Sequence, residues 1–179
     1  MAKPASHPPS PIRSAAQLGA IRRAESQKSW ALLGLPTASV IRLGLPDVQL
    51  TQHGEPLRAA LKQQLRASDV VVTTWQHDGH PDHKASGICA MRACAEVGCR
   101  LLQAPVWMWH WATPGDARVP WTRLQRLEIL APAWARERAA LQAHHSQLSA
   151  GSPGKSHRHP VLDAAIVDRA SRRHAYFFI

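Results

Sequence analysis

Strand-like and helix-like segments alternate along most of this chain, and the clearest is the β-branched, apolar run at 69–75, DVVVTTW. A continuous apolar run of this kind is typical of a strand buried on both faces of a parallel sheet. The loop DGHPDH follows it, and then a helical segment at 84–97 that Gly98 is placed to end. The alternation predicts an α/β fold, a mostly parallel sheet with helices on both faces.

The remaining elements are predicted from hydrophobic period and from turn residues. A helix is expected at 15–33, with Ser14 as its N-cap and Gly34 as its stop. The segment 101–111 alternates in a way that indicates a strand, with Trp107, Trp109 and Trp111 on one buried face. Further strands are expected at 38–45 and 124–129, further helices at 56–67, at 132–148 and shortly before the apolar end at 175–179.

The length of 179 residues suits one domain with a sizeable core. We expect residues 1–13 to be a proline-rich loop or arm and residues 14–179 to form a single α/β domain that contains a polar linker at 150–160. No apolar stretch reaches the roughly 18 residues of a membrane span, and the N-terminus lacks the apolar core of a secretory signal. A cytoplasmic protein is therefore expected.

The charge balance and the cysteines carry less information. A net charge of +10 favours anionic partners. The basic residues are scattered, however, and no nucleic-acid-binding motif accompanies them, so a basic nucleic-acid-binding protein is the weaker alternative. Cys89, Cys94 and Cys99 recur every five residues, a spacing that fits neither a metal knuckle nor a disulfide framework. They are expected to be buried, reduced residues.

The chemistry of the chain is expected at the loop of residues 78–83, DGHPDH. This loop leaves the carboxyl end of the predicted strand and leads into a helix N-terminus, the place where ligands bind in open α/β sheets. Imidazoles are common metal ligands, and Asp82, two residues from His80, is placed to orient that imidazole. The alternative is a surface turn that happens to be rich in His and Asp.

Several motifs, taken in order, resemble those of the PIG-L/LmbE-like N-acetylglucosaminyl deacetylases. They are RRAES at 22–26, LGLPD at 43–47, DVVVTTWQHDGHPDHKASG at 69–87, PVWMWHW at 105–111 and AHHSQ at 143–147. The resemblance extends over nearly the whole chain. It implies a Rossmann-like (LmbE-like) sheet and metal-assisted hydrolysis of the acetamide of an N-acetylated amino sugar or a related amide, with Zn²⁺ as the cofactor.

The resemblance also implies roles for individual residues. His83, the last histidine of HPDH, corresponds to a metal ligand, and His80 corresponds to the acid or electrostatic partner at the reacting carbonyl, supported by Asp82. Arg22, Asp47 and His144 correspond to residues that lie near the sugar. A small-molecule N-acetyl amino sugar is thus the expected partner, and neither nucleic acid nor a membrane is.

The chain departs from the family in one large respect and in smaller ones. A His-Pro-Asp-Asp-Glu motif, which supplies the other metal ligands and the base, is absent, and the first strand–helix–strand unit is expected to be missing with it. Because a hydrolytic zinc needs about three protein ligands, we expect the chain alone to be inactive and to retain no zinc. We expect the absence of the motif to reflect truncation of the sequence at its start, and the alternative is a non-catalytic remnant of the family with at most sugar-binding ability. Val48 stands where a glycine commonly follows LPD.

Overall fold

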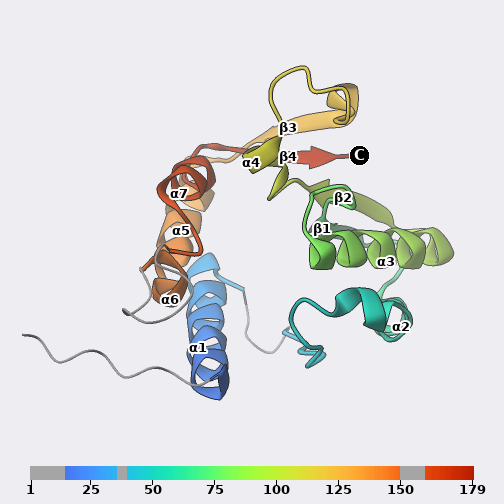
Figure 1. Cartoon of the computed structure of the whole chain (residues 1–179), viewed down its shortest axis with the longest axis horizontal. Coiled ribbons are helices and arrows are strands. Elements are labelled where there is room, and N and C mark those ends of the chain that lie inside the picture. The colour runs from blue at the N-terminus through green and yellow to red at the C-terminus, as the bar shows by residue number, and fades with distance from the viewer. Residues whose placement is uncertain (1–14, 36–39, 150–159) are drawn as a thin grey trace, which may run out of the picture. The chain divides into compact units, whose positions relative to one another are not determined.

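A computed structural model describes residues 15–35, 40–149 and 160–179 (Figure 1). The expected arm at 1–13, Ser14 and all of the expected linker except Pro160 lie outside the described residues. The described chain divides into two compact units. The helical unit contains the described residues up to Val40 and Ile129–Arg173, and the sheet unit contains Ile41–Glu128 and His174–Ile179.

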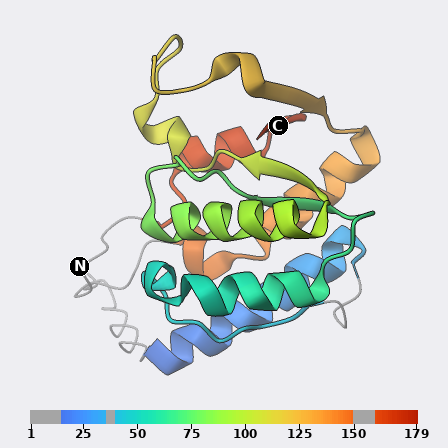
Figure 2. The same ribbon diagram turned by 90° about the vertical axis from the view of Figure 1, so that its right-hand side faces the viewer.

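The sheet unit holds all four strands of the described chain and the helices that pack on them. Its elements are the 3-10 helix η2 (Leu50–His53), α2 (Gly54–Gln64), β1 (Val70–Thr74), α3 (Pro81–Val97), β2 (Arg100–Ala104), α4 (Met108–Trp111), the 3-10 helix η3 (Trp121–Arg123), β3 (Leu124–Glu128) and β4 (His174–Phe178). Helix α3 packs on β1 and β2, and α2 packs on the other side of α3, so sheet, α3 and α2 form three successive layers (Figure 2).

The sheet is mixed, and the expectation of a mostly parallel sheet is wrong. Its order is β1-β2-β4-β3, and β1 pairs with β2 in parallel through the crossover helix α3. The two other pairings, of β4 with β2 and with β3, are antiparallel. A parallel pair needs a crossover that packs back on the sheet, and α3 provides one between β1 and β2. The apolar end of the chain, which was not predicted as a strand, forms β4 and inserts between β2 and β3.

The predicted strand at 101–111 is also shorter than expected. Strand β2 ends at Ala104, because Pro105 has no N–H to donate to the sheet, and one helical turn, α4, occupies 108–111. The three tryptophans therefore do not share a strand face. Trp107 is 42% exposed, whereas Trp109 and Trp111 pack against the core. Residues 40–45, expected in a strand, form none.

The core of the sheet unit is aromatic. Trp75, directly after β1, stacks on Phe178 of β4 with ring centroids 4.3 Å apart, and Met108 and Val119 complete the buried cluster. Burying such large rings is a strong driving force for folding. The cluster also fixes where β1 ends, and so where the 78–83 loop begins.

The helical unit consists of α1 (Ala15–Leu33), α5 (Ala131–Gln142), α6 (His145–Leu148) and α7 (Ala164–Ala170). Helix α1 has the predicted bounds, and Gly34 follows it with the positive φ of 81° that suits a helix stop. The single helix expected at 132–148 is divided at 143–144 into α5 and α6. Helix α1 packs on α5 and α6.

Two simpler expectations can be compared with the structure. Cys89 and Cys94 are buried as free thiols, and Cys99 is a half-buried one. None of the described helices combines the length and the apolar character that crossing a lipid bilayer requires.

Candidate active site

The 78–83 loop is held between the end of β1 and the start of α3. Thr74 Oγ1 at the strand end donates a hydrogen bond to the His83 carbonyl at 3.0 Å. Gly79 has a φ of +96°, and a Cβ at that position would lie 2.9 Å from Trp111 Nε1. The same indole nitrogen donates to the Asp78 carbonyl at 2.9 Å. Only glycine combines this backbone conformation with so close an approach, so the loop is rigidly placed.

Asp78 is the buried centre of the loop, with no exposed surface. Its carboxylate accepts the backbone N–H groups of Val106, Trp107 and Met108 at 2.8–2.9 Å, and its Oδ2 lies 2.5 Å from His83 Nδ1. Burial by itself would raise the pKa of this carboxyl, but the bonds from His83 and the three backbone N–H groups outweigh burial and hold the pKa below its ordinary value. Asp78 is therefore ionised at neutral pH.

The bond to Asp78 decides what His83 can do. A buried, ionised carboxylate only accepts hydrogen bonds, so His83 Nδ1 carries the proton and donates. In the neutral imidazole, Nε2 then keeps its lone pair. This is the arrangement in which a carboxylate fixes the ring orientation and the tautomer of a metal-binding histidine. The side chain of His83 is 22% exposed, which leaves the ring accessible.

His80 is fixed in the opposite tautomer. It is the N-cap of α3, and its Nδ1 accepts the backbone N–H of Asp82 at 3.2 Å. A ring nitrogen that accepts has no proton, so the Nε2 of neutral His80 is a hydrogen-bond donor. The two rings lie 4.7 Å apart between centroids. The loop thus presents one imidazole lone pair and one imidazole N–H side by side.

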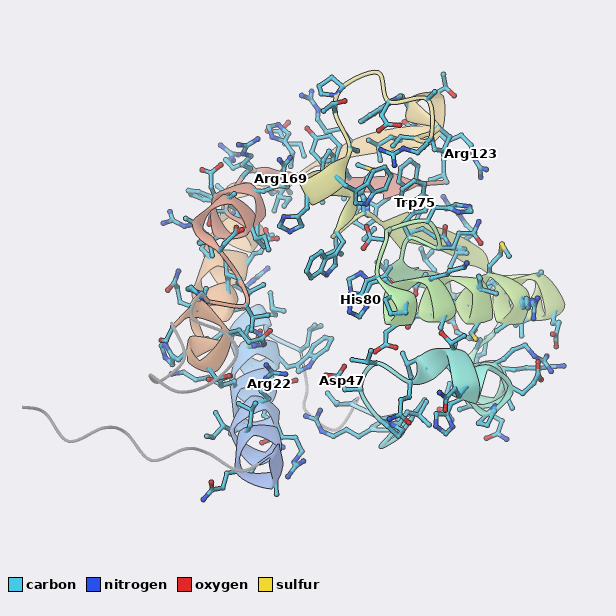
Figure 3. All side chains as sticks on the ribbon, in the orientation of Figure 1. Arg22, Asp47, Trp75, His80, Arg123 and Arg169 are labelled. Carbon is cyan, nitrogen blue, oxygen red and sulfur yellow. The ribbon has the colours of Figure 1, made fainter. Side chains whose placement is uncertain are left out.

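Asp82 connects this loop to the segment that contains Asp47. Its carboxylate accepts the backbone N–H of Val48 at 2.7 Å and that of Leu50 at 3.2 Å. Asp82 therefore contacts the His80 ring through its backbone, while its side chain holds the 47–50 segment. Asp47 itself is exposed on this segment (Figure 3).

Val48 adopts a left-handed backbone conformation, which glycine adopts far more readily than a β-branched residue. Its φ is +62°, the one positive φ among the described non-glycine residues. A β-branched residue is strained there by about 1–2 kcal/mol, which the bond from its N–H to Asp82 helps to offset.

We expect Val48→Gly to stabilise the protein by about 1 kcal/mol, because glycine adopts this φ without a steric penalty. Urea unfolding followed by tryptophan fluorescence measures the effect. Val72→Gly is the matched control, since Val48 and Val72 are 62% and 58% exposed, and Val72 lies in regular strand β1. Val72→Gly should destabilise the protein, because glycine is unfavourable in a strand. A loss of stability in both variants would contradict the inference that the backbone is strained at Val48.

A cavity of about 910 Å³ opens beside His80. Its walls come from the loop, the first turn of α3, and the segment around Trp111 and Arg118; they are Gln76, His77, Gly79, His80, Pro81, Lys84, Trp111, Ala117, Arg118 and Pro120. The size suits a small-molecule ligand. His80 is thus both an N-cap and a cavity wall.

The described side chains do not by themselves fit a zinc ion. His83 offers one lone pair, but both carboxylates are already bonded, Asp78 to the protein on both oxygens and Asp82 to two backbone N–H groups. In the described ranges, no three His, Cys, Asp or Glu side chains are grouped so that they could hold a metal. One ligand is fewer than the roughly three that a catalytic zinc takes from a protein.

The two other predicted site residues belong to the helical unit. Arg22 on α1 has a buried Nε without a hydrogen-bond partner, and His144, between α5 and α6, lies 3.4 Å from the Gln147 side chain through its Nδ1. Glu25 accepts the Ser146 N–H at 2.7 Å and its hydroxyl at 2.6 Å, which joins α1 to α6. Arg22 and Glu25 therefore do not form the surface pair that their i, i+3 spacing allows.

The role of Asp78 as the hydrogen-bond partner of His83 was not predicted from the sequence. The signal that could have indicated its role is an aspartate in the loop after a strand, five residues before a ligand-type histidine. The cavity residues Lys84 and Arg118 were also missed. Arg118 approaches the loop only through the fold, because 34 residues separate it from Lys84.

Comparison with protein families matches residues 2–94, more than half of the chain, to the family described as PIG-L, GlcNAc-PI de-N-acetylase. No curated protein and no solved structure matches the chain. The matched segment contains the RRAES and LGLPD motifs and the complete DGHPDH loop. This match over more than half of the sequence shows that the chain belongs to the PIG-L (GlcNAc-PI de-N-acetylase) family.

Proposed function

We propose that this chain recognises the acetamide group of an N-acetylated amino sugar or a related amide at the 78–83 loop, as a member of a deacetylase lineage. Membership in the family indicates a deacetylase-like function on a small-molecule amino sugar. In our proposal, the Nε2–H of His80 donates to the carbonyl oxygen of the acetamide. Donors aimed at such an oxygen stabilise the negative charge that develops there during amide hydrolysis.

One observation carries this proposal: the two neighbouring imidazoles are fixed in opposite tautomers. The two ring centroids are 4.7 Å apart. A group that polarises a carbonyl must donate a hydrogen bond, and a metal ligand must offer a lone pair, so the two rings together meet both requirements. We assign the first role to His80 and the second, toward Zn²⁺, to His83, with Asp78 as its positioning residue. Asp82 positions the loop, and Arg22, Asp47 and His144 are proposed to contact the sugar.

A second candidate function is sugar binding without turnover. It is favoured by the lack, among the described residues, of three side chains grouped to hold a metal, and by the two loop carboxylates, which are both engaged in hydrogen bonds. A carboxylate in this state is poorly suited to act as a general base. Both candidates predict recognition of the acetamide, and they differ only in the release of acetate.

Recognition of the acetamide, which both candidate functions predict, is tested by measuring the binding of N-acetylglucosamine and of glucose by calorimetry. We expect N-acetylglucosamine to bind more tightly than glucose. His80→Ala should weaken the binding of N-acetylglucosamine by about threefold to tenfold, the usual contribution of one hydrogen bond to affinity. Glucose affinity should not change. His80→Gln, which keeps a donor, should retain part of the preference. His110→Ala, on an exposed residue outside the cavity wall, is the control.

Equal affinity for the two sugars in the unchanged protein would refute acetamide recognition at this loop. Acetate release in the presence of added zinc then separates the two candidates. We expect none above background from this chain, because one imidazole holds zinc too weakly. Chelator-sensitive release would instead favour catalysis.

A further inference from the structure

We propose that Cys94 and Cys99 are a modification site, at which a small disulfide such as oxidised glutathione converts the two thiols into a reversible disulfide. This inference does not depend on the proposed function, because the two cysteines lie at the C-terminal end of α3 and the 78–83 loop lies at its start. The observation behind it is the turn that ends α3. Its hydrogen bonds fold Cys99 back onto the last turn of the helix, beside Cys94.

The turn contains the hydrogen bond of a Schellman motif, a common helix ending in which a left-handed residue reverses the chain. Gly98 is that residue, with a φ of +83°, and the Cys94 carbonyl oxygen accepts the N–H of Cys99 at 3.1 Å. In this motif the side chains of the two hydrogen-bonded residues usually pack together. Standard bond lengths on either side of this hydrogen bond keep the two Cα atoms within about 7 Å, the limit for a disulfide.

The two thiols differ in accessibility, and this difference sets the order of the reaction. Cys94 is 3% exposed, whereas Cys99 is half-buried. Burial, and after it a hydrogen bond with the Cys99 thiol, raises the pKa of Cys94 to about 12. Cys94 therefore has little thiolate at neutral pH, and the more accessible Cys99 reacts first. Cys94 is the second thiol, held next to the sulfur that it attacks.

The reaction consists of two successive thiol–disulfide exchanges. In the first, the Cys99 thiolate attacks one sulfur of oxidised glutathione, the glutathione S–S bond breaks, and one glutathione thiolate leaves. In the second, Cys94 loses its proton and attacks the Cys99 sulfur, which forms the Cys94–Cys99 bond and releases the other glutathione thiolate. The two cysteines lose two electrons and two protons, and the two departing glutathione molecules take them up.

Cys89 provides a matched comparison within the same helix. It lies five residues before Cys94, just as Cys99 lies five residues after it. Five residues of regular helix rotate a side chain by about 140° around the axis, so Cys89 and Cys94 point to different sides of α3. The Cys89 thiol donates instead to the Gly54 carbonyl at 3.3 Å. The two pairs have the same spacing in the sequence, and only the fold makes their geometry different.

Peptide mapping after oxidation tests the proposal. The reduced protein is incubated with an excess of oxidised glutathione, the remaining thiols are alkylated in denaturant, and trypsin is added. Cleavage follows the basic residues Lys84, Arg92 and Arg100. Cys89 then lies in peptide 85–92, and the other two cysteines lie together in peptide 93–100. We expect peptide 93–100 to carry no alkyl group and to be lighter by two hydrogen atoms, and peptide 85–92 to be alkylated.

Two results would overturn the proposal. The first is peptide 93–100 with both thiols alkylated, or with glutathione retained on Cys99. The second is a bond between peptides 85–92 and 93–100 that forms as readily in the folded protein. We expect the Cys94–Cys99 bond to exceed the Cys89–Cys94 bond by at least about tenfold in the folded protein, because only the first pair has disulfide geometry. In urea the two pairs should form similar amounts, since their loops have equal length.

Substitutions then assign the role of each thiol. Cys94→Ala should stop the reaction at the first exchange, with one glutathione retained on Cys99, because the second thiol is missing. Cys99→Ala should leave Cys94 unmodified in the folded protein, because no accessible thiol begins the exchange. Cys89→Ala is the matched control and should form the disulfide as the unchanged protein does. Glutathione retained on Cys94 in the Cys99→Ala variant would overturn the assigned order.

Discussion

Replacing Asp78 by alanine should lower the free energy of unfolding by about 4 kcal/mol, one of the two largest single-residue effects that we expect. The carboxylate accepts three buried backbone N–H groups and the His83 ring. Alanine leaves those donors without an acceptor, and each buried donor left unsatisfied costs about 1–3 kcal/mol. Urea unfolding followed by tryptophan fluorescence gives the free energy.

Asp69→Ala is the matched control for this measurement. The Asp69 carboxylate also accepts a backbone N–H, that of Arg66 at 2.8 Å, but at the surface. Water replaces the lost acceptor there, so we expect a cost of about 1 kcal/mol or less. Comparable losses in the two variants would mean that the buried network around Asp78 does not stabilise the fold as the geometry indicates.

Asp78→Asn separates the electronic effect of Asp78 from its structural one. Asparagine has nearly the same side-chain shape as aspartate, but its NH₂ group cannot accept a hydrogen bond from His83 Nδ1. Where the NH₂ faces that ring, Nδ1 of His83 must accept a hydrogen bond, so the ring proton moves to Nε2. Nε2 then has no lone pair, although the proposed role of His83 as a metal ligand requires one. Nitrogen-15 shifts of the imidazoles report the tautomer. We expect a change at His83 and none at His80, whose partner is backbone.

Replacing Gly87 by alanine should destabilise the protein by about 3 kcal/mol, although alanine is the better helix former by about 1 kcal/mol. A Cβ at Gly87 would lie 2.7 Å from the Thr74 carbonyl oxygen and 2.8 Å from the Gln76 nitrogen. Both are backbone atoms that cannot rotate away. Helix α3 would have to move off the end of β1, and the His83 carbonyl would move away from Thr74 Oγ1 with it.

Gly54→Ala is the control for Gly87→Ala, because both glycines belong to helices of the sheet unit. Gly54 is the first residue of α2, and Gly87 lies inside α3. Its backbone is helical, with a φ of −59°, and the nearest atom to a new Cβ is Cys89 Sγ at an ordinary 3.7 Å. We expect this variant to be neutral or slightly stabilising. Thermal unfolding of both variants gives the comparison, and a gain in stability for Gly87→Ala would show that α3 does not approach the strand so closely.

The sequence could predict much of the local structure. Helix α1 has its predicted bounds, because its stop signal, Gly34, lies next to the residues it affects. Strand β1 and helix α3 were predicted for a similar reason, since a β-branched run and a glycine stop act locally. The position of the candidate site followed from the same segment, because a loop between such a strand and helix is where α/β sheets bind ligands.

The segment after β2 shows why other features could not be predicted. The alternation of tryptophans at 107–111 has the period of a strand, but the chain turns into α4 there. The carboxylate that binds the N–H groups of Val106, Trp107 and Met108 belongs to Asp78, about 30 residues earlier. A local period contains no information on an acceptor so distant in the sequence.

The sequence by itself therefore determined the family motifs, the DGHPDH loop and the elements on either side of it. Tertiary structure alone decided the tautomers of His80 and His83, the strain at Val48 and the meeting of Lys84 with Arg118 at one cavity. The reason is physical. Helix and strand preferences arise between neighbours in the chain, whereas a proton position or a cavity wall depends on which distant groups the fold brings within hydrogen-bond distance.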